Sequence, residues 1–149
     1  MIEGVTVTSR RQIVDERGKI MHMLRADDPE FQHFGEVYFS WVNPGVIKAW
    51  HLHDEMTLNY VCPYGLIKMV LYDPRSDSPS HGQVTELFLG PDNYNLVSVP
   101  PHVWNGFKGI APCASLVCNC STIPHRANEI HRLDPFSVEI PYDWSLKHG

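Results

Sequence analysis

The sequence has 149 residues, of which 43% are hydrophobic and 19% charged, and this length and composition suit one domain with a buried core. Its 12 basic and 17 acidic residues give a formal net charge of −5, which argues against a general nucleic-acid binder, because such proteins meet phosphates with a basic surface. No secretory signal is visible at the N-terminus, and no stretch reaches the roughly 18 apolar residues of a membrane span. A cytoplasmic protein with no membrane partner is therefore expected.

Short runs of alternating apolar residues, rich in β-branched and aromatic types, predict a series of β-strands. In chain order these runs span 4–9, 19–24, 35–42, 46–53, 66–73, 83–90, 95–100 and 114–120. Residues 27–34 are expected to hold one helical turn, and the proline-rich segment after Thr122 is expected to wrap over the domain as loop and short helix. Many short strands separated by turn-forming residues predict a single all-β domain over residues 1–149, folded as a sandwich or barrel.

The four cysteines do not point to a structural metal site. They are Cys62, Cys113, Cys118 and Cys120, and their spacing lacks the paired C-x-x-C of structural zinc sites. Disulfides are not expected in a reducing compartment. We expect these cysteines to be ordinary strand residues.

Two histidines one residue apart, His51 and His53, are the main candidates for a functional site. Side chains alternate along a strand, so both should point to the same side of strand 46–53, with Cα atoms about 7 Å apart. The plainest interpretation is a pair of hydrogen-bonded residues at a barrel mouth. A second is a metal site, because two imidazoles on one face suit zinc, iron or nickel. Further along the chain, however, only His102 and Asn105 are offered as additional ligands.

A third interpretation is acid–base catalysis, because histidine can take and return a proton near neutral pH. A catalytic histidine works best when a carboxylate fixes its tautomer and stabilises its charged form. Asp134 and the adjacent pair Asp54 and Glu55 are the candidate carboxylates. The residue pattern alone leaves all three interpretations open.

Five motifs, in the same order along the chain, resemble those of the dTDP-4-dehydrorhamnose 3,5-epimerases. They are DERGKI (15–20), GVIKAWHLH (45–53), LYDPRSDSPSHG (71–82), SVPPHVWNGF (98–107) and the ending RLDPF with IPYDW (132–136 and 140–144). That family consists of cupin-fold enzymes that act on nucleotide-linked 4-keto-6-deoxy sugars. The resemblance therefore implies a cupin or jelly-roll β-sandwich with little helix.

The resemblance also implies roles for individual residues. His51 matches the catalytic base, Asp134 matches the aspartate that pairs with it, and Arg17 matches an arginine that contacts the nucleotide phosphates. Arg75 matches a family arginine that could bind substrate or stabilise a turn. The other candidates for substrate binding are Tyr38, Lys48, His53 and Asn105.

The sequence departs from the family pattern at four positions. Lys48 stands in place of an arginine, Leu58 in place of a lysine that steadies the enolate, and Asn105 in place of a histidine. The segment expected to carry the proton-donating tyrosine has none, and His125 is the only evident replacement there. Epimerisation at one carbon, or movement of a carbonyl between C3 and C4, requires fewer groups than epimerisation at two carbons.

The sequence thus predicts an epimerase or isomerase of nucleotide-linked 4-keto-6-deoxyhexoses, of the kind used in polysaccharide biosynthesis. His51 would act as the base, with no metal and no cofactor required. The alternatives are a metal-dependent cupin that uses His51 and His53, and a catalytically silent cupin that binds a sugar nucleotide. A homodimer is expected from the resemblance, and because an edge strand such as 4–9 needs a partner.

Overall fold

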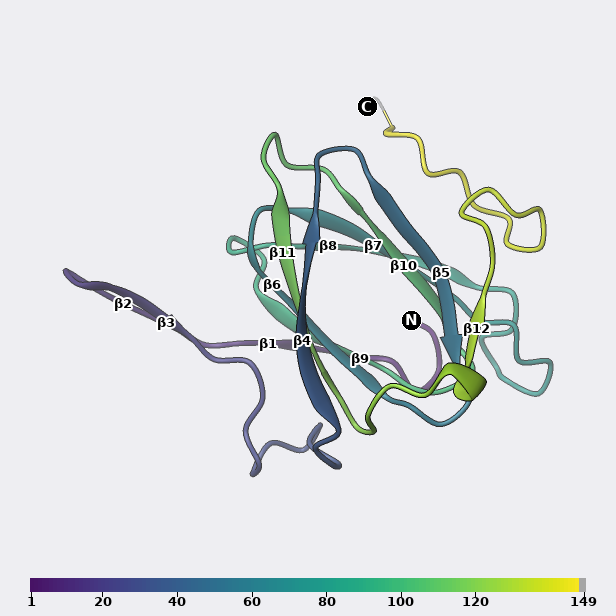
Figure 1. Cartoon of the computed structure of the whole chain (residues 1–149), viewed down its shortest axis with the longest axis horizontal. Helices are drawn as coiled ribbons and strands as arrows, with labels where there is room; N and C mark the ends of the chain where they lie inside the picture. The colour runs from purple at the N-terminus through teal and green to yellow at the C-terminus, as the bar shows by residue number, and fades with distance from the viewer. Residues whose placement is uncertain (148–149) are drawn as a thin grey trace.

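The computed structural model describes residues 1–147, and these residues form an almost entirely antiparallel β structure (Figure 1). The strands are β1 (Thr6–Ser9), β2 (Gln12–Asp15), β3 (Gly18–Met21), β4 (Glu36–Val42), β5 (Ile47–His53), β6 (Leu58–Tyr64), β7 (Ile67–Tyr72), β8 (Val84–Leu89), β9 (Asn95–Val99), β10 (Trp104–Gly109), β11 (Ser115–Ser121) and β12 (Ile130–Arg132). A 3-10 helix, η1 (Ala127–Glu129), precedes β12. No helix within residues 1–147 is long and apolar enough to cross a membrane.

Ten of the strands form two five-stranded sheets that face each other as a jelly roll (Figure 1). The first sheet has the strand order β1-β9-β6-β11-β4, and the second has the order β12-β5-β10-β7-β8. Strands β2 and β3 pair only with each other, and their hairpin projects away from the two sheets. The all-β jelly roll expected from the sequence is confirmed.

Apolar side chains from alternate strand positions fill the space between the sheets. This inner core includes Leu58, Tyr60 and Cys62 of β6, Ile67, Met69 and Leu71 of β7, Val97 and Val99 of β9, Phe107 of β10 and Val117 of β11. Alternation puts such residues on one face because successive side chains of a strand point to opposite sides. Each large buried side chain contributes about 1.5–3 kcal/mol, so this layer holds the two sheets together.

The C-terminal segment packs on the outer face of the second sheet, as the sequence predicted. Trp50 of β5 and Trp144 of the C-terminal segment are buried, and their ring centroids lie 5.0 Å apart. Both indole N–H groups donate to the carbonyl oxygen of Pro135, at 3.3 Å from Trp50 and 3.1 Å from Trp144. Because β12 leads directly into this segment, the contact helps to hold β12 against the edge of β5.

The structure corrects the predicted elements in two respects. Strands β2, β6, β10 and β12 were not predicted: β6 contains Pro63, β10 follows two prolines, and β12 is only three residues long. Residues 27–30 form turns and residues 31–34 are irregular, so no helical turn is present in this segment. The Asp28 carboxylate there accepts hydrogen bonds from the Arg25 backbone N–H and the Arg10 guanidinium, which favours the turn over a continuing helix.

Candidate functional site

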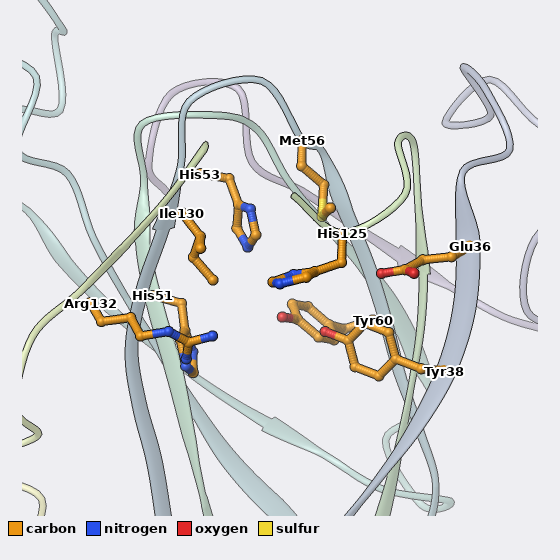
Figure 2. A pocket seen from close by; sticks show the side chains of 9 residues that line it. All are labelled: Glu36, Tyr38, His51, His53, Met56, Tyr60, His125, Ile130 and Arg132. Carbon is orange, nitrogen blue, oxygen red and sulfur yellow. The ribbon is translucent and has the colours of Figure 1, made fainter. Parts of the chain in front are cut away.

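A cavity of ≈ 290 Å³ lies between the two sheets, at the lower end of the size range of ligand sites (Figure 2). Its lining consists of Glu36, Tyr38, His51, His53, Met56, Tyr60, His125, Ile130 and Arg132. Strands β5 and β12 of the second sheet form one wall. Strands β4 and β6 of the first sheet, with the loop after β11, form the opposite wall. Both histidines of the H-x-H pair therefore face a cavity, as the strand alternation predicted.

Pairing of β12 with β5 brings the C-terminal part of the chain to the histidines. Arg132 lies opposite His51 and Ile130 lies opposite His53 in the antiparallel register. Directly opposed residues point to the same face of a sheet, so these four side chains share one wall. Figure 2 shows the Arg132 guanidinium beside the His51 ring. The site thus contains a cation that no motif around the histidines indicated.

The two histidines have different partners. Nδ1 of His53 makes a short hydrogen bond with the carboxylate of Glu129, and both side chains are almost fully buried. Glu129 also accepts hydrogen bonds from the backbone N–H groups of Glu55 at 3.2 Å and Met56 at 3.3 Å. Burial alone would raise the pKa of Glu129, but the hydrogen bonds from His53 and the two backbone groups outweigh it and lower that pKa. Glu129 is therefore a charged carboxylate that fixes the His53 ring.

His51 has no such carboxylate. Within residues 1–147 no hydrogen bond of its ring is found, and burial, followed by the charges of Arg132 and His53, lowers the pKa of His51 to about 4. The ring is consequently neutral at pH 7. A neutral imidazole has a nitrogen lone pair that can accept a proton.

The opposite wall carries two tyrosines in one row with an asparagine. Asn119 of β11 lies opposite Tyr38 of β4 on one side and opposite Tyr60 of β6 on the other, so all three face the inside of the sandwich. Asn119 Nδ2 donates to the Tyr38 hydroxyl oxygen at 3.1 Å. The Tyr60 hydroxyl donates to Asn105 Oδ1 at 3.4 Å. In Figure 2 both phenol groups point toward the middle of the cavity.

The structure does not show the predicted pairing of Asp134 with His51. Asp134 is exposed, and its carboxylate accepts a hydrogen bond from the backbone N–H of Phe136 at 2.8 Å. An aspartate that precedes a proline commonly binds the backbone two residues on, and this local turn holds the side chain away from the cavity. Asp54 pairs with His131 on the surface at 2.9 Å, and Glu55 lies 3.6 Å from Arg126. Neither supports His51.

Three other predicted binding residues have structural roles. Arg75 holds the buried carboxylate of Asp73 with two hydrogen bonds, of 2.7 and 2.8 Å, so the turn role is the one observed. The Lys48 ammonium donates to the Ser40 hydroxyl and the Trp41 carbonyl, both at 2.7 Å, and ties β5 to β4. Asn105 is buried behind the cavity, and its amide donates to the His51 carbonyl at 3.0 Å. These three residues have polar partners within the fold and do not line the cavity, and their contact with substrate stays a prediction.

Arg17 lies at the turn of the β2–β3 hairpin, away from its own chain's cavity (Figure 1). Its side chain is 85% exposed and pairs with Asp15 at 2.6 Å. His125, by contrast, lines the cavity, on the loop between β11 and η1. Of the predicted site residues, the cavity therefore brings together Tyr38, His51, His53 and His125.

The residues named for a metal site are not gathered around the histidine pair. His102 is on the surface, with its ring Nδ1 3.8 Å from Asp54, and Asn105 is engaged within the fold. Within residues 1–147 no group of three or more His, Cys, Asp or Glu side chains is arranged to hold a metal ion. Of the four cysteines, which are unpaired, Cys62, Cys118 and Cys120 are buried strand residues and Cys113 is exposed in a turn.

Sequence reasoning missed four polar residues of the site: Glu36, Tyr60, Glu129 and Arg132. Glu36 and Tyr60 lie on strand faces that become inner faces only when the sheets pack together. Glu129 and Arg132 belong to a segment without a clear strand pattern. Ile130 and Arg132, two residues apart, were the one available signal, since they point to the same face of a short strand; Glu129 lies just before it in η1, where strand alternation does not apply.

Comparison with known proteins agrees with this geometry. The family model of dTDP-4-dehydrorhamnose 3,5-epimerase matches residues 1–148. The chain belongs to this family. The match covers all five motifs and nearly the whole chain.

Two curated relatives and one solved structure align with nearly the full chain. A probable low-salt glycan biosynthesis epimerase, Agl13 of Haloferax volcanii, is 35% identical over 95% of this chain and 89% of its own length. The spore coat polysaccharide biosynthesis protein SpsL of Bacillus subtilis is 31% identical over 96% of this chain and 91% of its own. The crystal structure of a dTDP sugar isomerase from Desulfovibrio desulfuricans G20 superposes with a TM-score of 0.94 at 45% identity, covering 96% of this chain and 92% of that one.

Proposed function

We propose that this chain is an epimerase or isomerase that acts on a nucleotide-linked 4-keto-6-deoxyhexose, by removing a proton from a carbon beside the ketone. The observation that carries the proposal is one cavity in which a neutral histidine, His51, faces tyrosine hydroxyls across a gap. Membership of the epimerase family supports the substrate class. The residues of the whole chain, 1–149, would act as one cupin domain.

His51 is the proposed base, and Arg132 supplies the charge that this chemistry needs. A proton beside a ketone can be removed because the resulting negative charge spreads onto the carbonyl oxygen. The family lysine that would steady this enolate is replaced by Leu58, which is buried in the inner core. Arg132, directly opposite His51 in the strand pairing, is the cation on that wall of the cavity. Burial is the main reason that the pKa of His51 is lowered, and the Arg132 charge, which adds to this effect, can stabilise the enolate oxygen.

His53 is proposed to shape the cavity and contact the substrate. Its Nδ1 is bound to Glu129, which leaves Nε2 as the ring nitrogen available to the cavity. Because Nδ1–H donates to the Glu129 carboxylate, Nε2 of the neutral ring can accept a hydrogen bond from a sugar hydroxyl. Tyr38 would lie on the other side of the sugar ring.

The proposed function predicts solvent exchange at one or two sugar carbons. Wild-type protein would be incubated with a panel of nucleotide-linked 4-keto-6-deoxyhexoses in deuterated water, and the products analysed by NMR and mass spectrometry. We expect deuterium at C3 or C5, and the labelled carbon identifies the position attacked. Binding of a sugar nucleotide without deuterium entry into any member of the panel would instead identify a silent binding protein. No binding at all would reject the substrate class.

We also propose that the protein is a homodimer, with edge strand β4 in or near the contact. Alternate residues of β4, namely Val37, Phe39 and Trp41, are 46%, 64% and 57% exposed, which is unusual for large apolar side chains on one strand face. An exposed strand edge with such a face needs a cover. The projecting β2–β3 hairpin could bring Arg17 to nucleotide phosphates only in a second copy's cavity.

Gel filtration with light scattering tests the dimer. Wild-type protein should elute at twice the chain mass of 17.0 kDa, and Phe39→Glu should shift it to a single chain, because a charge would be buried in an apolar contact. Mixing inactive His51→Asn chains with inactive Arg17→Ala chains should recover part of the activity. A wild-type monomer of 17.0 kDa, or failure of the mixture to regain activity, would contradict the proposal.

A further inference from the structure

The wall of the cavity opposite the histidines contains a hydroxyl group with no assigned role. Resting on the proposed function, we propose that Tyr38 is the catalytic proton donor, returning a proton to the substrate carbon on the face opposite His51. A tyrosine on β4 would thereby do the work of the tyrosine absent from the segment around His125. The position differs in the chain, but the hydroxyl enters the same cavity.

The location of Tyr38 fits this role. Tyr38 is in the first sheet and His51 in the second, and Figure 2 shows the two rings on opposite sides of the cavity with open space between them. Inversion at a carbon requires a proton to leave from one face and arrive at the other. Tyr38 is 41% exposed, whereas Tyr60 beside it is 5% exposed, so the Tyr38 hydroxyl is the more accessible of the two to a bound sugar.

The hydrogen bond from Asn119 to Tyr38 leaves the Tyr38 proton free for transfer. The buried amide of Asn119 accepts a hydrogen bond from the Asn59 backbone N–H at 2.9 Å through Oδ1, which assigns Nδ2 as its donor end. Nδ2 then donates to the Tyr38 oxygen at 3.1 Å. Tyr38 is the acceptor in this contact, so its own O–H proton is not needed there. Donation from Asn119 also stabilises the phenolate that remains once Tyr38 has released its proton.

The other two candidates on this wall are less suited to the role. The Tyr60 hydroxyl donates to Asn105 Oδ1, and burial, then the neighbouring Tyr38, raise the pKa of Tyr60 well above its ordinary value. Tyr60 therefore retains its proton. His125 is exposed on a loop, and within residues 1–147 no hydrogen bond of its ring is found to fix its orientation.

Every proton in the proposed step has a source and a destination. His51 takes the proton from the carbon beside the ketone, and the electron pair of the broken C–H bond forms the enolate. The Tyr38 O–H bond then breaks, its proton forms the new C–H bond on the opposite face, and the enolate returns to the ketone. Tyr38 is left as phenolate and His51 as imidazolium. One proton passes from His51 to solvent and one from solvent to Tyr38, which restores both groups.

The experiment separates proton removal from inversion. Wild-type, Tyr38→Phe, His125→Gln and Tyr60→Phe proteins are incubated in deuterated water with the sugar nucleotide that labels in the wild type. Deuterium in recovered substrate and formation of inverted product are measured separately. For Tyr38→Phe we expect inverted product to fall about 100-fold or more, while deuterium still enters substrate of unchanged configuration, because His51 can return the label to the face it came from. Tyr64→Phe, on an exposed tyrosine outside the cavity, is the matched control and should match the wild type.

Three outcomes would overturn the assignment. Wild-type product formation by Tyr38→Phe would show that its hydroxyl is not the donor. Loss of exchange together with product would show that Tyr38 acts in binding or enolate formation. If His125→Gln or Tyr60→Phe lost inversion but kept exchange, and Tyr38→Phe did not, the replaced residue of that variant would be the proton donor. These outcomes differ from failure of the proposed function, in which the wild-type protein itself would show no deuterium exchange.

Discussion

Replacing His51 by asparagine should lower the rate of deuterium entry into the substrate about 10³-fold, the scale expected when a positioned base is removed. His51 is the cavity histidine whose ring has no hydrogen bond within residues 1–147, so its lone pair is available for the substrate. Asparagine is of similar size and leaves Arg132 in place, so affinity for the nucleotide should stay nearly unchanged. Exchange is measured by NMR and affinity by calorimetry, under the same conditions.

His53→Gln is the matched comparison, because His53 is the neighbouring imidazole on the same wall. A loss well below that of His51→Asn is expected, since glutamine retains hydrogen-bonding groups and His51 is untouched. Equal loss in both variants, with restoration of both by an added divalent metal, would reject the base and favour a metal site.

The pH dependence of the epimerisation rate is an independent test of His51 as the base. Burial, then Arg132 and His53, lower the pKa of His51 to about 4, so the reactive neutral form predominates above that pH. Epimerisation expressed as kcat/KM should therefore stay level between about pH 7 and pH 5, and fall only as the pH approaches 4. A half-maximal rate near the ordinary histidine pKa of about 6.5 would show that a different histidine is the base.

Replacing Glu129 by alanine should lower the free energy of unfolding by about 3 kcal/mol, because buried hydrogen-bond donors lose their acceptor at a cost of about 1–3 kcal/mol each. The carboxylate is 4% exposed and accepts hydrogen bonds from the His53 ring and from the backbone N–H groups of Glu55 and Met56. Alanine would leave all three donors without this acceptor, and the donors of His53 and Met56 are buried. Glu129→Gln retains an acceptor oxygen and should cost less, about 1–2 kcal/mol.

Chemical denaturation at several pH values measures this effect. The folded-state pKa of Glu129 is lowered, so its contribution is present above the unfolded value of about 4.5 and is lost as the pH falls through the folded-state pKa. The difference between wild type and Glu129→Ala should therefore shrink in acid. Glu139→Ala, an exposed glutamate in the same C-terminal part of the chain, is the control and should change stability little. An equal loss in both variants would show that the Glu129–His53 contact does not stabilise the fold.

The two predictions together describe a wall in which two neighbouring histidines have different partners. One imidazole is fixed by a buried carboxylate, and the other lies beside a guanidinium without a carboxylate partner. A proton-transfer site needs both properties, because the substrate must be held in one orientation while a neutral base remains free to react.

Much of the site was determined by the local sequence. The period-two pattern of residues 46–53 places His51 and His53 on one face of a strand, because side-chain direction along a strand alternates regardless of what the strand packs against. The net charge of −5 argued against a general nucleic-acid binder, and this inference needs only the composition. Tyr38 was also predicted to bind substrate, and it lines the cavity.

Only the tertiary structure decided which residues surround those histidines. Arg132 reaches His51 because short strand β12 adds to the edge of β5, and that register depends on the C-terminal segment packing over Trp50. The same register brings Glu129 to His53, whereas Asp134 stays in its own turn. The Tyr38–Asn119–Tyr60 row likewise exists only where β4, β11 and β6 lie side by side. Contacts of this kind join segments far apart in the sequence, and they are set by burial over the whole chain, which no local pattern specifies.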